Sequence, residues 1–221
     1  MTEALKETSH ARLMDGIYRR QRLIYDATRK YYLLGRDRLI DELDVPAGGS
    51  VLEMACGTGR NLAKIARHYP DCTLYGADIS SEMLISARRA AEREGLGKRM
   101  RLAEGDATSF DAEAVFGQPM FDRVVLSYSL SMIPDWSGAL AQALVLTKPG
   151  GSLHVVDFGE QAQLPGAFRS VLQAWLARFH VAPRADLETE LESLARASNG
   201  SLRFTSLYRD YARYAVLTRP A

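Results

Sequence analysis

The stretch "SVLEMACGTGRN", residues 50–61, decides the fold, because it joins a buried apolar segment to a helix through a glycine loop. Residues 50–55 are predicted to form a strand, and the apolar residues from Leu62 to Tyr69 recur with helical spacing. Gly57 and Gly59 let the backbone turn tightly and lie against a ligand. The amino terminus of the next helix then points at that ligand. The stretch is therefore predicted to be the binding turn of a βα unit.

The rest of the chain alternates short apolar runs with helical patterns, as a βαβ sheet requires. Further strands are predicted at 73–79, 100–107, 121–130 and 152–158, with helices at 80–95 and from 136 to a Pro-Gly-Gly turn. Two helices, 165–182 and 186–198, precede strands 202–209 and 211–219, which a tight turn around Asp210 joins. Seven strands with a terminal antiparallel hairpin predict a doubly wound α/β domain over 45–221, with an N-terminal helical extension over 1–44.

The composition is that of one globular domain, with 221 residues, of which 47% are hydrophobic and 25% are charged. A net charge of +1 argues against a nucleic-acid binder that acts through overall charge. Cys56 and Cys72 lack the spacing of a zinc site, so no metal is predicted and reduced thiols in the cytoplasm are expected. We expect no secretory leader and no membrane-spanning run, which leaves only peripheral membrane contact.

An acidic residue ends each of the first two predicted strands. Glu53 ends the first, and Asp78, nineteen residues after Gly59, ends the second, where a carboxylate can accept both ribose hydroxyls of a cofactor. Asp78 could instead serve a helix N-cap, since two serines adjoin it. The ribose role is favoured because Asp78 is in register with Glu53 and the glycine loop. NAD enzymes use a third glycine in this loop, where the chain has Leu62.

These residues, together with "GDAT" (105–108) and "LTKPGG" (146–151), resemble the class I S-adenosylmethionine-dependent methyltransferases over residues 45–160. That family carries an E/DxGxGxG loop, from which this chain departs at Ala55. The resemblance implies a Rossmann-like fold that binds S-adenosylmethionine, releases S-adenosylhomocysteine and uses no metal. It places Asp106 on the adenine amino group and Ala107 beside the ring, which Ile79 and Met83 would sandwich. The residues implied to bind the cofactor are Glu53, Ala55, Gly57, Thr58, Gly59, Asn61, Asp78, Ile79, Met83, Asp106, Ala107 and Ser127.

The end of the fourth predicted strand separates substrate classes. Methyltransferases of adenine, cytosine or glutamine amides often carry D/N/S-PP-Y/F there, whereas this chain has "LSYSLSMIPDW" (126–136). Nucleic-acid substrates are therefore not expected.

The N-terminal segment is rich in tyrosines and cations, with seven basic residues against two aspartates over residues 17–38. "YDATRKYYLLGRDRLI" (25–40), the 126–136 segment, "VVDFGEQ" (155–161), "LPGAFR" (164–169) and "AWLARFHV" (174–181) are most similar to the bacterial diacylglyceryl-homoserine N-methyltransferases of betaine-lipid synthesis. That resemblance implies three methyl transfers to a lipid-linked homoserine amine at a membrane surface. It also suggests the enzyme that makes the homoserine lipid as a partner, and a cytoplasmic location on the inner membrane face.

The catalytic candidates follow from the chemistry of that head group. Tyrosine faces attract alkylammonium groups, and an arginine can bind a carboxylate through two hydrogen bonds. Tyr25, Tyr31, Tyr32 and Arg36 supply these groups in a segment that could fold over the cofactor as a lid. Packing of the tyrosines against the domain is the competing explanation.

Two further residues are candidates for the amine proton, Tyr128 after the fourth strand and Asp157 at the end of the fifth. A methyltransferase of a soluble small molecule or a quinone remains an alternative function, as does a non-catalytic cofactor-binding regulator. The amphipathic helix 165–182 is expected to cover the sheet, with contact to a lipid surface as the alternative. The sequence predicts no oligomeric state.

Overall fold

The structure, a computed structural model, describes residues 33–179 and 181–221. Its seven strands form one sheet in the order β3-β2-β1-β4-β5-β7-β6. The strands are β1 (Ser50–Met54), β2 (Thr73–Asp78), β3 (Met100–Glu104), β4 (Phe121–Ser127), β5 (Thr147–Phe158), β6 (Ser201–Leu207) and β7 (Ala212–Thr218). The helices are α2 (Arg36–Asp41), α3 (Arg60–His68), α4 (Ser81–Arg93), α5 (Ala112–Phe116), α6 (Trp136–Val145), α7 (Gly166–Ala177) and α8 (Leu187–Ala197).

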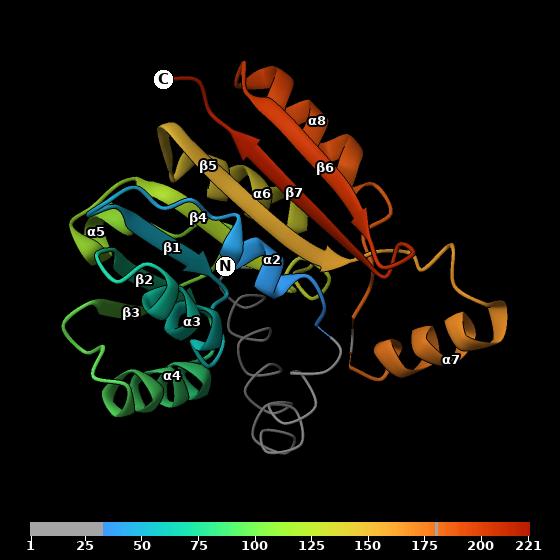
Figure 1. Ribbon diagram of the computed structural model, residues 1–221, viewed down its shortest axis with the longest axis horizontal. Helices are drawn as coiled ribbons and strands as arrows, with labels where there is room; N and C mark the ends of the chain where they lie inside the picture. The colour runs from blue at the N-terminus through green and yellow to red at the C-terminus, as the bar shows by residue number, and fades with distance from the viewer. Residues whose placement is uncertain (1–32, 180) are drawn as a thin grey trace, which may run out of the picture.

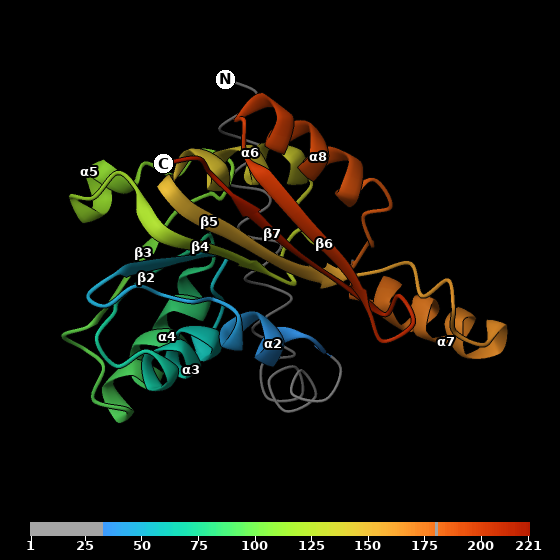
Figure 2. The same ribbon diagram turned by 45° about the horizontal axis from the view of Figure 1, so that its top comes forward.

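The first five strands are parallel, and β7 runs antiparallel to both β5 and β6. Helices cover both faces of the sheet, with α2, α3 and α4 on one face and α5, α6 and α8 on the other (Figures 1 and 2). The doubly wound α/β fold with a terminal antiparallel hairpin is therefore confirmed. The strand order reverses between β1 and β4, which is where sheets of this kind bind their ligands.

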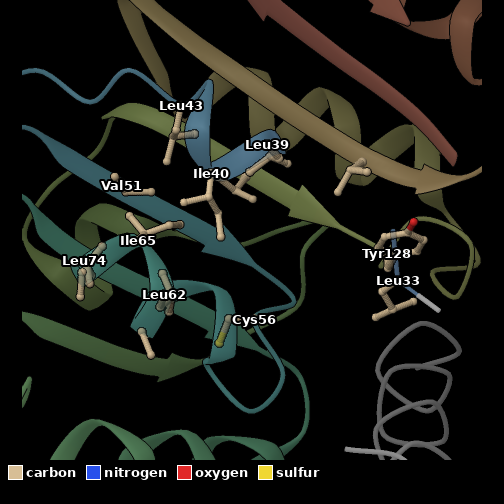
Figure 3. Packing of buried hydrophobic residues seen from close by; sticks show 14 of the residues in the cluster. Leu33, Leu39, Ile40, Leu43, Val51, Cys56, Leu62, Ile65, Leu74 and Tyr128 are labelled. Atoms are coloured by element: carbon tan, nitrogen blue, oxygen red, sulfur yellow. The ribbon is translucent and has the colours of Figure 1, made fainter. Parts of the chain in front are cut away.

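The strands of the centre are buried on both faces, which explains their continuous apolar composition. All five residues of β1 are buried, including Glu53. Figure 3 shows Leu39 and Ile40 of α2, and Leu43 just after it, in one cluster with Val51 of β1. Residues 33–44 thus pack as part of the core, whereas the remainder of the predicted N-terminal extension lies outside the described residues.

Two local predictions differ from the structure. The sequence pattern did not predict α5, a five-residue helix that Asp111 caps by accepting a hydrogen bond from the Ala114 amide at 2.9 Å. The helix predicted from residue 136 ends at Val145, and β5 already begins at Thr147. The Pro-Gly-Gly turn lies inside this strand, where a register shift against β4 between Phe121 and Arg123 accommodates it.

Candidate functional site

The glycine loop between β1 and α3 is built from residues in the left-handed backbone region. Gly57 and Gly59 have φ of 56° and 71°, values that cost glycine little. Ala55 also has a positive φ, of 54°, where a side chain is disfavoured. The methyltransferase loop pattern has glycine at this position, and the structure shows why: the alanine must adopt a glycine conformation.

Asp78 at the end of β2 is joined directly to this loop. Its carboxylate accepts a hydrogen bond from the Gly57 amide at 2.7 Å and one from the Ser80 amide at 2.9 Å. The N-cap of α4 is Ser80, whose hydroxyl oxygen accepts from the Met83 amide. The N-cap role therefore belongs to Ser80, and the Asp78 carboxylate braces the turn before α4. Its contact with a ribose remains a prediction.

Glu53 is a buried acid at the end of β1, with only 2% of its surface exposed. One carboxylate oxygen, Oε1, accepts a hydrogen bond from the Asn61 amide group at 2.7 Å. The other oxygen, Oε2, is buried and has no hydrogen-bond partner in the part of the chain that the structure describes. Burial raises the pKa of Glu53 to about 8, against the lowering effects of Asn61 and the Arg36 cation.

A cavity of about 490 Å³ lies at the carboxyl ends of β1, β2 and β4, at the reversal of strand order. Among the residues that line it are Leu33, Arg36, Glu53, Ala55, Gly57, Thr58, Arg60, Asn61, Asp78, Ile79, Ser127, Tyr128, Ser129, Met132 and Ile133. The cavity therefore joins the glycine loop and both strand-end acids to the segment that follows β4.

Tyr128 turns the chain at the end of β4, with a positive φ of 55°. Its hydroxyl donates a hydrogen bond to the Leu34 carbonyl, and Figure 3 shows its side chain beside Leu33. Burial raises its pKa well above the usual range, so the phenol stays protonated at neutral pH. This geometry favours a role in holding the segment before α2 to the cavity, and it does not favour proton acceptance.

The serines on either side of Tyr128 have unsatisfied hydroxyl groups. The Oγ atoms of Ser127 and Ser129 are buried and lack a hydrogen-bond partner within residues 33–179 and 181–221. Both residues line the cavity, and Ser129 is 6% exposed. Buried polar groups are rarely left unsatisfied, so these hydroxyls are candidates for contact with a bound molecule.

Besides Gly59 in the glycine loop, four of the predicted site residues that the structure describes do not line the cavity. Met83 packs beneath it with Met132 and Phe179. The Asp106 carboxylate accepts from the amide and the hydroxyl of Thr108, both at 2.7 Å, and Ala107 packs against the core. Their adenine contacts remain predictions.

Asp157, the fourth of these residues, is buried behind the segment after β4. Its carboxylate accepts from the Ser131 amide at 3.1 Å and from the Phe158 amide at 2.7 Å. Burial raises its pKa, although these hydrogen bonds oppose the rise. The arrangement supports a positioning role for Asp157, and proton acceptance remains a prediction. Tyr25, Tyr31 and Tyr32 lie outside the described residues.

Comparison with known proteins agrees with this geometry. A family model described as a methyltransferase domain matches residues 51–151. A demethylmenaquinone methyltransferase of Thermus thermophilus is 30% identical, over 70% of this chain and 69% of that protein. The chain belongs to the class I S-adenosylmethionine-dependent methyltransferases. The ubiquinone/menaquinone biosynthesis C-methyltransferase of Dinoroseobacter shibae is 28% identical, over 74% of this chain and 64% of that protein.

Solved structures show the same methyltransferase fold. Phosphoethanolamine N-methyltransferase 2 of Haemonchus contortus, solved with S-adenosylmethionine, has a TM-score of 0.68 and 15% identity over 84% of this chain and 52% of that chain. This methyltransferase spans 64% of the length of the Dinoroseobacter relative. The resemblance to homoserine-lipid enzymes in particular remains a prediction, because both of the curated relatives described above are named for quinones.

The cavity of this methyltransferase fits S-adenosylmethionine in two respects. The orphaned Oε2 of Glu53 is suited to the α-ammonium group of the cofactor, since such an acceptor is costly to bury unpaired. Asp78 is suited to the ribose hydroxyls, because each carboxylate oxygen can accept more than one hydrogen bond. No group of three or more metal-binding side chains occurs among the described residues. Within the same residues, no helix is both long and apolar enough to cross a membrane.

Sequence reasoning missed several residues that line the cavity, among them Leu33, Arg60, Ser129, Met132 and Ile133. The alternating serines of "SYSLS" could have indicated Ser129, because a strand that is buried on both faces rarely carries so many hydroxyls. Nothing in the local pattern could have indicated Leu33, which reaches the cavity only because Tyr128 holds the Leu34 carbonyl.

Proposed function

We propose that this protein transfers methyl groups from S-adenosylmethionine to the amine of a lipid-linked homoserine head group. The observation that carries the proposal is the position of Arg36, which lines the cavity together with Tyr128. An arginine there supplies the partner that the head-group carboxylate needs. The hydroxyls of Ser127 and Ser129 add hydrogen-bonding capacity on the wall that follows β4.

The chain's own contribution is mainly positioning. When it is bound, S-adenosylmethionine supplies an electrophilic methyl group, which the lone pair of the acceptor attacks in line. Asp78 and Glu53 would fix the two ends of the cofactor, and the rigid turn at Tyr128 would fix the wall against which the acceptor lies. The neutral phenol of Tyr128 presents its ring as a surface for a developing alkylammonium cation.

A quinone is the second candidate acceptor. The names of the Thermus and Dinoroseobacter relatives favour it, since both act on quinones by name. The apolar residues Leu33, Met132 and Ile133 in the cavity wall suit a flat apolar ring. The two candidates share the cofactor site and differ in what Arg36 would contact, because a quinone has no carboxylate.

Methyl-labelled S-adenosylmethionine separates the candidates when the protein receives diacylglyceryl-homoserine and demethylated menaquinone in parallel reactions. Label in the polar lipid supports the first proposal, and label in the quinone replaces it with the second. The Asp78→Ala variant is the control, because it should lose cofactor-dependent labelling of either acceptor. If neither acceptor is labelled while S-adenosylhomocysteine still binds, both proposals are wrong and a binding protein without this activity is the better explanation.

A further inference from the structure

Helix α7 stands apart from the layers of the fold. It follows β5 at the carboxyl edge of the sheet, and Figures 1 and 2 both show it projecting from one end of the domain. Its inner side packs through Leu176, which is 1% exposed, and through the partly buried Leu172 and Trp175. The helix therefore packs against the core through this inner side but lies beyond the end of the sheet, so the prediction that it covers the sheet is wrong.

The outer side of α7 is apolar and exposed. Ala167, Val171 and Ala174 follow one another at helical spacing on this side, and all three are exposed. Val171 is 70% exposed, the highest value among the large apolar side chains whose exposure the structure describes. Arg178 continues the same stripe just beyond the helix.

The charged side chains of this region are all basic. No acidic residue occurs between Glu160 and Asp186, whereas Arg169 and Arg178 lie within or beside α7. The next helix, α8, has the more usual distribution of residues for a surface helix. It buries its apolar residues Leu187 and Leu191, and it carries three glutamates. The exposed side of α7 therefore combines apolar and cationic character in a way that α8 does not.

The turn between β6 and β7 lies beside the segment that leads into α7. Tyr208 at this turn is 55% exposed, and Arg209 beside it is also exposed. Asp210 ties the turn to the root of α7, because it accepts hydrogen bonds from the Glu160 amide through its carboxylate and from the Gln161 amide through its carbonyl. Tyrosine and arginine are residues that suit the interface between lipid and water.

We propose that this surface, formed by Ala167, Val171, Ala174 and Arg178 with Tyr208 and Arg209, docks on an anionic phospholipid bilayer. The apolar stripe would enter the head-group region while the arginines contact lipid phosphates. Negative charge on the partner is required because the surface offers cations and no exposed acid of its own.

The inner side of the same helix leads to the cavity. Phe179, just after α7, packs with Met132, which lines the cavity, and with Met83. The proposal does not depend on which acceptor is methylated, because a lipid-linked amine and an isoprenoid quinone both reside in bilayers. Its failure would therefore leave the proposed reaction untouched.

Co-sedimentation of the full chain with vesicles tests the surface. The protein should bind vesicles of phosphatidylglycerol and phosphatidylcholine, should not bind phosphatidylcholine alone, and should dissociate as salt is raised. Val171→Asp should weaken binding about tenfold or more, because an aspartate replaces an apolar group at an anionic surface. Val145→Asp is the matched control on α6, since Val145 is 62% exposed and lies outside the surface.

Melting temperature and S-adenosylhomocysteine affinity should be the same in both variants and the wild type, which excludes unfolding as the cause. The proposal is overturned if the wild type does not bind anionic vesicles, or if Val171→Asp binds them as tightly as the wild type does. A third result would also overturn it. In this result the wild type does not bind vesicles and sediments as a dimer without lipid, and Val171→Asp sediments as a monomer. That result would assign the surface to a second copy of the chain.

Discussion

The side-chain amide of Asn61 donates a 2.7 Å hydrogen bond to Oε1 of Glu53, while Oε2 of the same carboxylate is buried without a hydrogen-bond partner among the described residues. The acid at one end of the cofactor pocket therefore has a hydrogen-bond partner for only one of its two oxygens. Burial raises its pKa to about 8, so Glu53 is mostly protonated in the free protein at neutral pH.

Cofactor affinity should consequently depend on pH. A bound α-ammonium group favours the charged carboxylate, so binding expels the proton that Glu53 carries below pH 8. Affinity for S-adenosylhomocysteine should rise roughly tenfold per pH unit from pH 6 towards 8 and then level off. Calorimetry in buffers of different ionisation enthalpy should show up to one proton released at pH 6 to 7.

Glu53→Gln is the control for this prediction, because it retains an oxygen for Asn61 and cannot titrate. Its affinity should be low and independent of pH in this range. The free protein should show the matching stability effect: the contribution of Glu53 is fully present below its unfolded pKa of about 4.5 and is lost as pH rises through 8. A wild-type affinity that is flat from pH 6 to 8 would remove Glu53 from the cofactor site.

Asp78 offers a second test of the cofactor site. Asp78→Ala should weaken S-adenosylhomocysteine binding by about 1–3 kcal/mol, because charged hydrogen bonds to the ribose are lost. It should also lower the melting temperature, since the Gly57 and Ser80 amides lose their acceptor. Glu104→Ala is the matched control: Glu104 pairs with Asp78 in the sheet register, is exposed and does not line the cavity. Unchanged affinity in Asp78→Ala with normal affinity in Glu104→Ala would refute the ribose assignment.

The comparison of Asp78 with Glu53 shows how far the sequence could predict this site. The strand ends, the glycine loop and the two acids follow from apolar runs and glycine spacing, which are local properties of the chain. That Asp78 also bonds Gly57 depends on the register between β1 and β2, a long-range property that no local pattern encodes. The confirmed elements are those whose burial shows in the sequence as a recognisable pattern of apolar residues.

The positions that sequence reasoning missed have non-local causes. Ser129 lies beyond the end of β4, where the chain turns at Tyr128 with a positive φ, so the alternation of a strand no longer predicts where its side chain lies. Helix α5 was missed because five residues are too few for a period to show. The N-terminal tyrosines lie outside the described residues, so their predicted role as a lid stays a prediction.

Ser129→Ala separates a binding hydroxyl from a structural one. Removing a buried hydroxyl that lacks a partner should leave the melting temperature unchanged or raise it, because its desolvation cost of about 1–3 kcal/mol disappears. Acceptor KM should rise, while S-adenosylhomocysteine affinity stays the same. Ser50→Ala is the contrasting control, since the Ser50 hydroxyl donates to Asp122 at 2.7 Å and its loss should destabilise the fold. Normal acceptor KM in Ser129→Ala would show that the hydroxyl contacts no acceptor.

Arg36→Ala tests whether the acceptor carries a carboxylate. Loss of a charged hydrogen-bond partner should raise acceptor KM by roughly 10- to 100-fold. S-adenosylhomocysteine affinity should fall less than this, and only because the pKa of Glu53 rises without the Arg36 cation. Arg38→Ala is the control on the same helix, because Arg38 pairs with Glu42 and does not line the cavity. The opposite result, with weaker cofactor binding and an unchanged KM, would assign Arg36 to the carboxylate of the cofactor.

His154 predicts a pH-dependent stability that is independent of the site. Its ring is buried in β5 between the Ser152 hydroxyl at 2.9 Å and the Tyr214 hydroxyl at 3.0 Å. Burial lowers its pKa to about 3, from an unfolded value of about 6.5. Between these values the unfolded chain binds a proton that the folded protein does not. The contribution of His154 is therefore fully present above pH 6.5 and is lost as pH falls towards 3.

Urea unfolding from pH 5 to 7 measures this effect, and it must be read as a difference between variants. Glu53 acts in the opposite direction over the same range, since its stabilising contribution grows as pH falls from 8. Subtracting the curve of His154→Gln from that of the wild type removes Glu53 and leaves a term of about 1.4 kcal/mol per pH unit below 6.5. If His154→Gln has the same pH dependence as the wild type, His154 titrates in the folded protein as it does in the unfolded chain, and the buried hydrogen-bonded ring is not what sets its pKa.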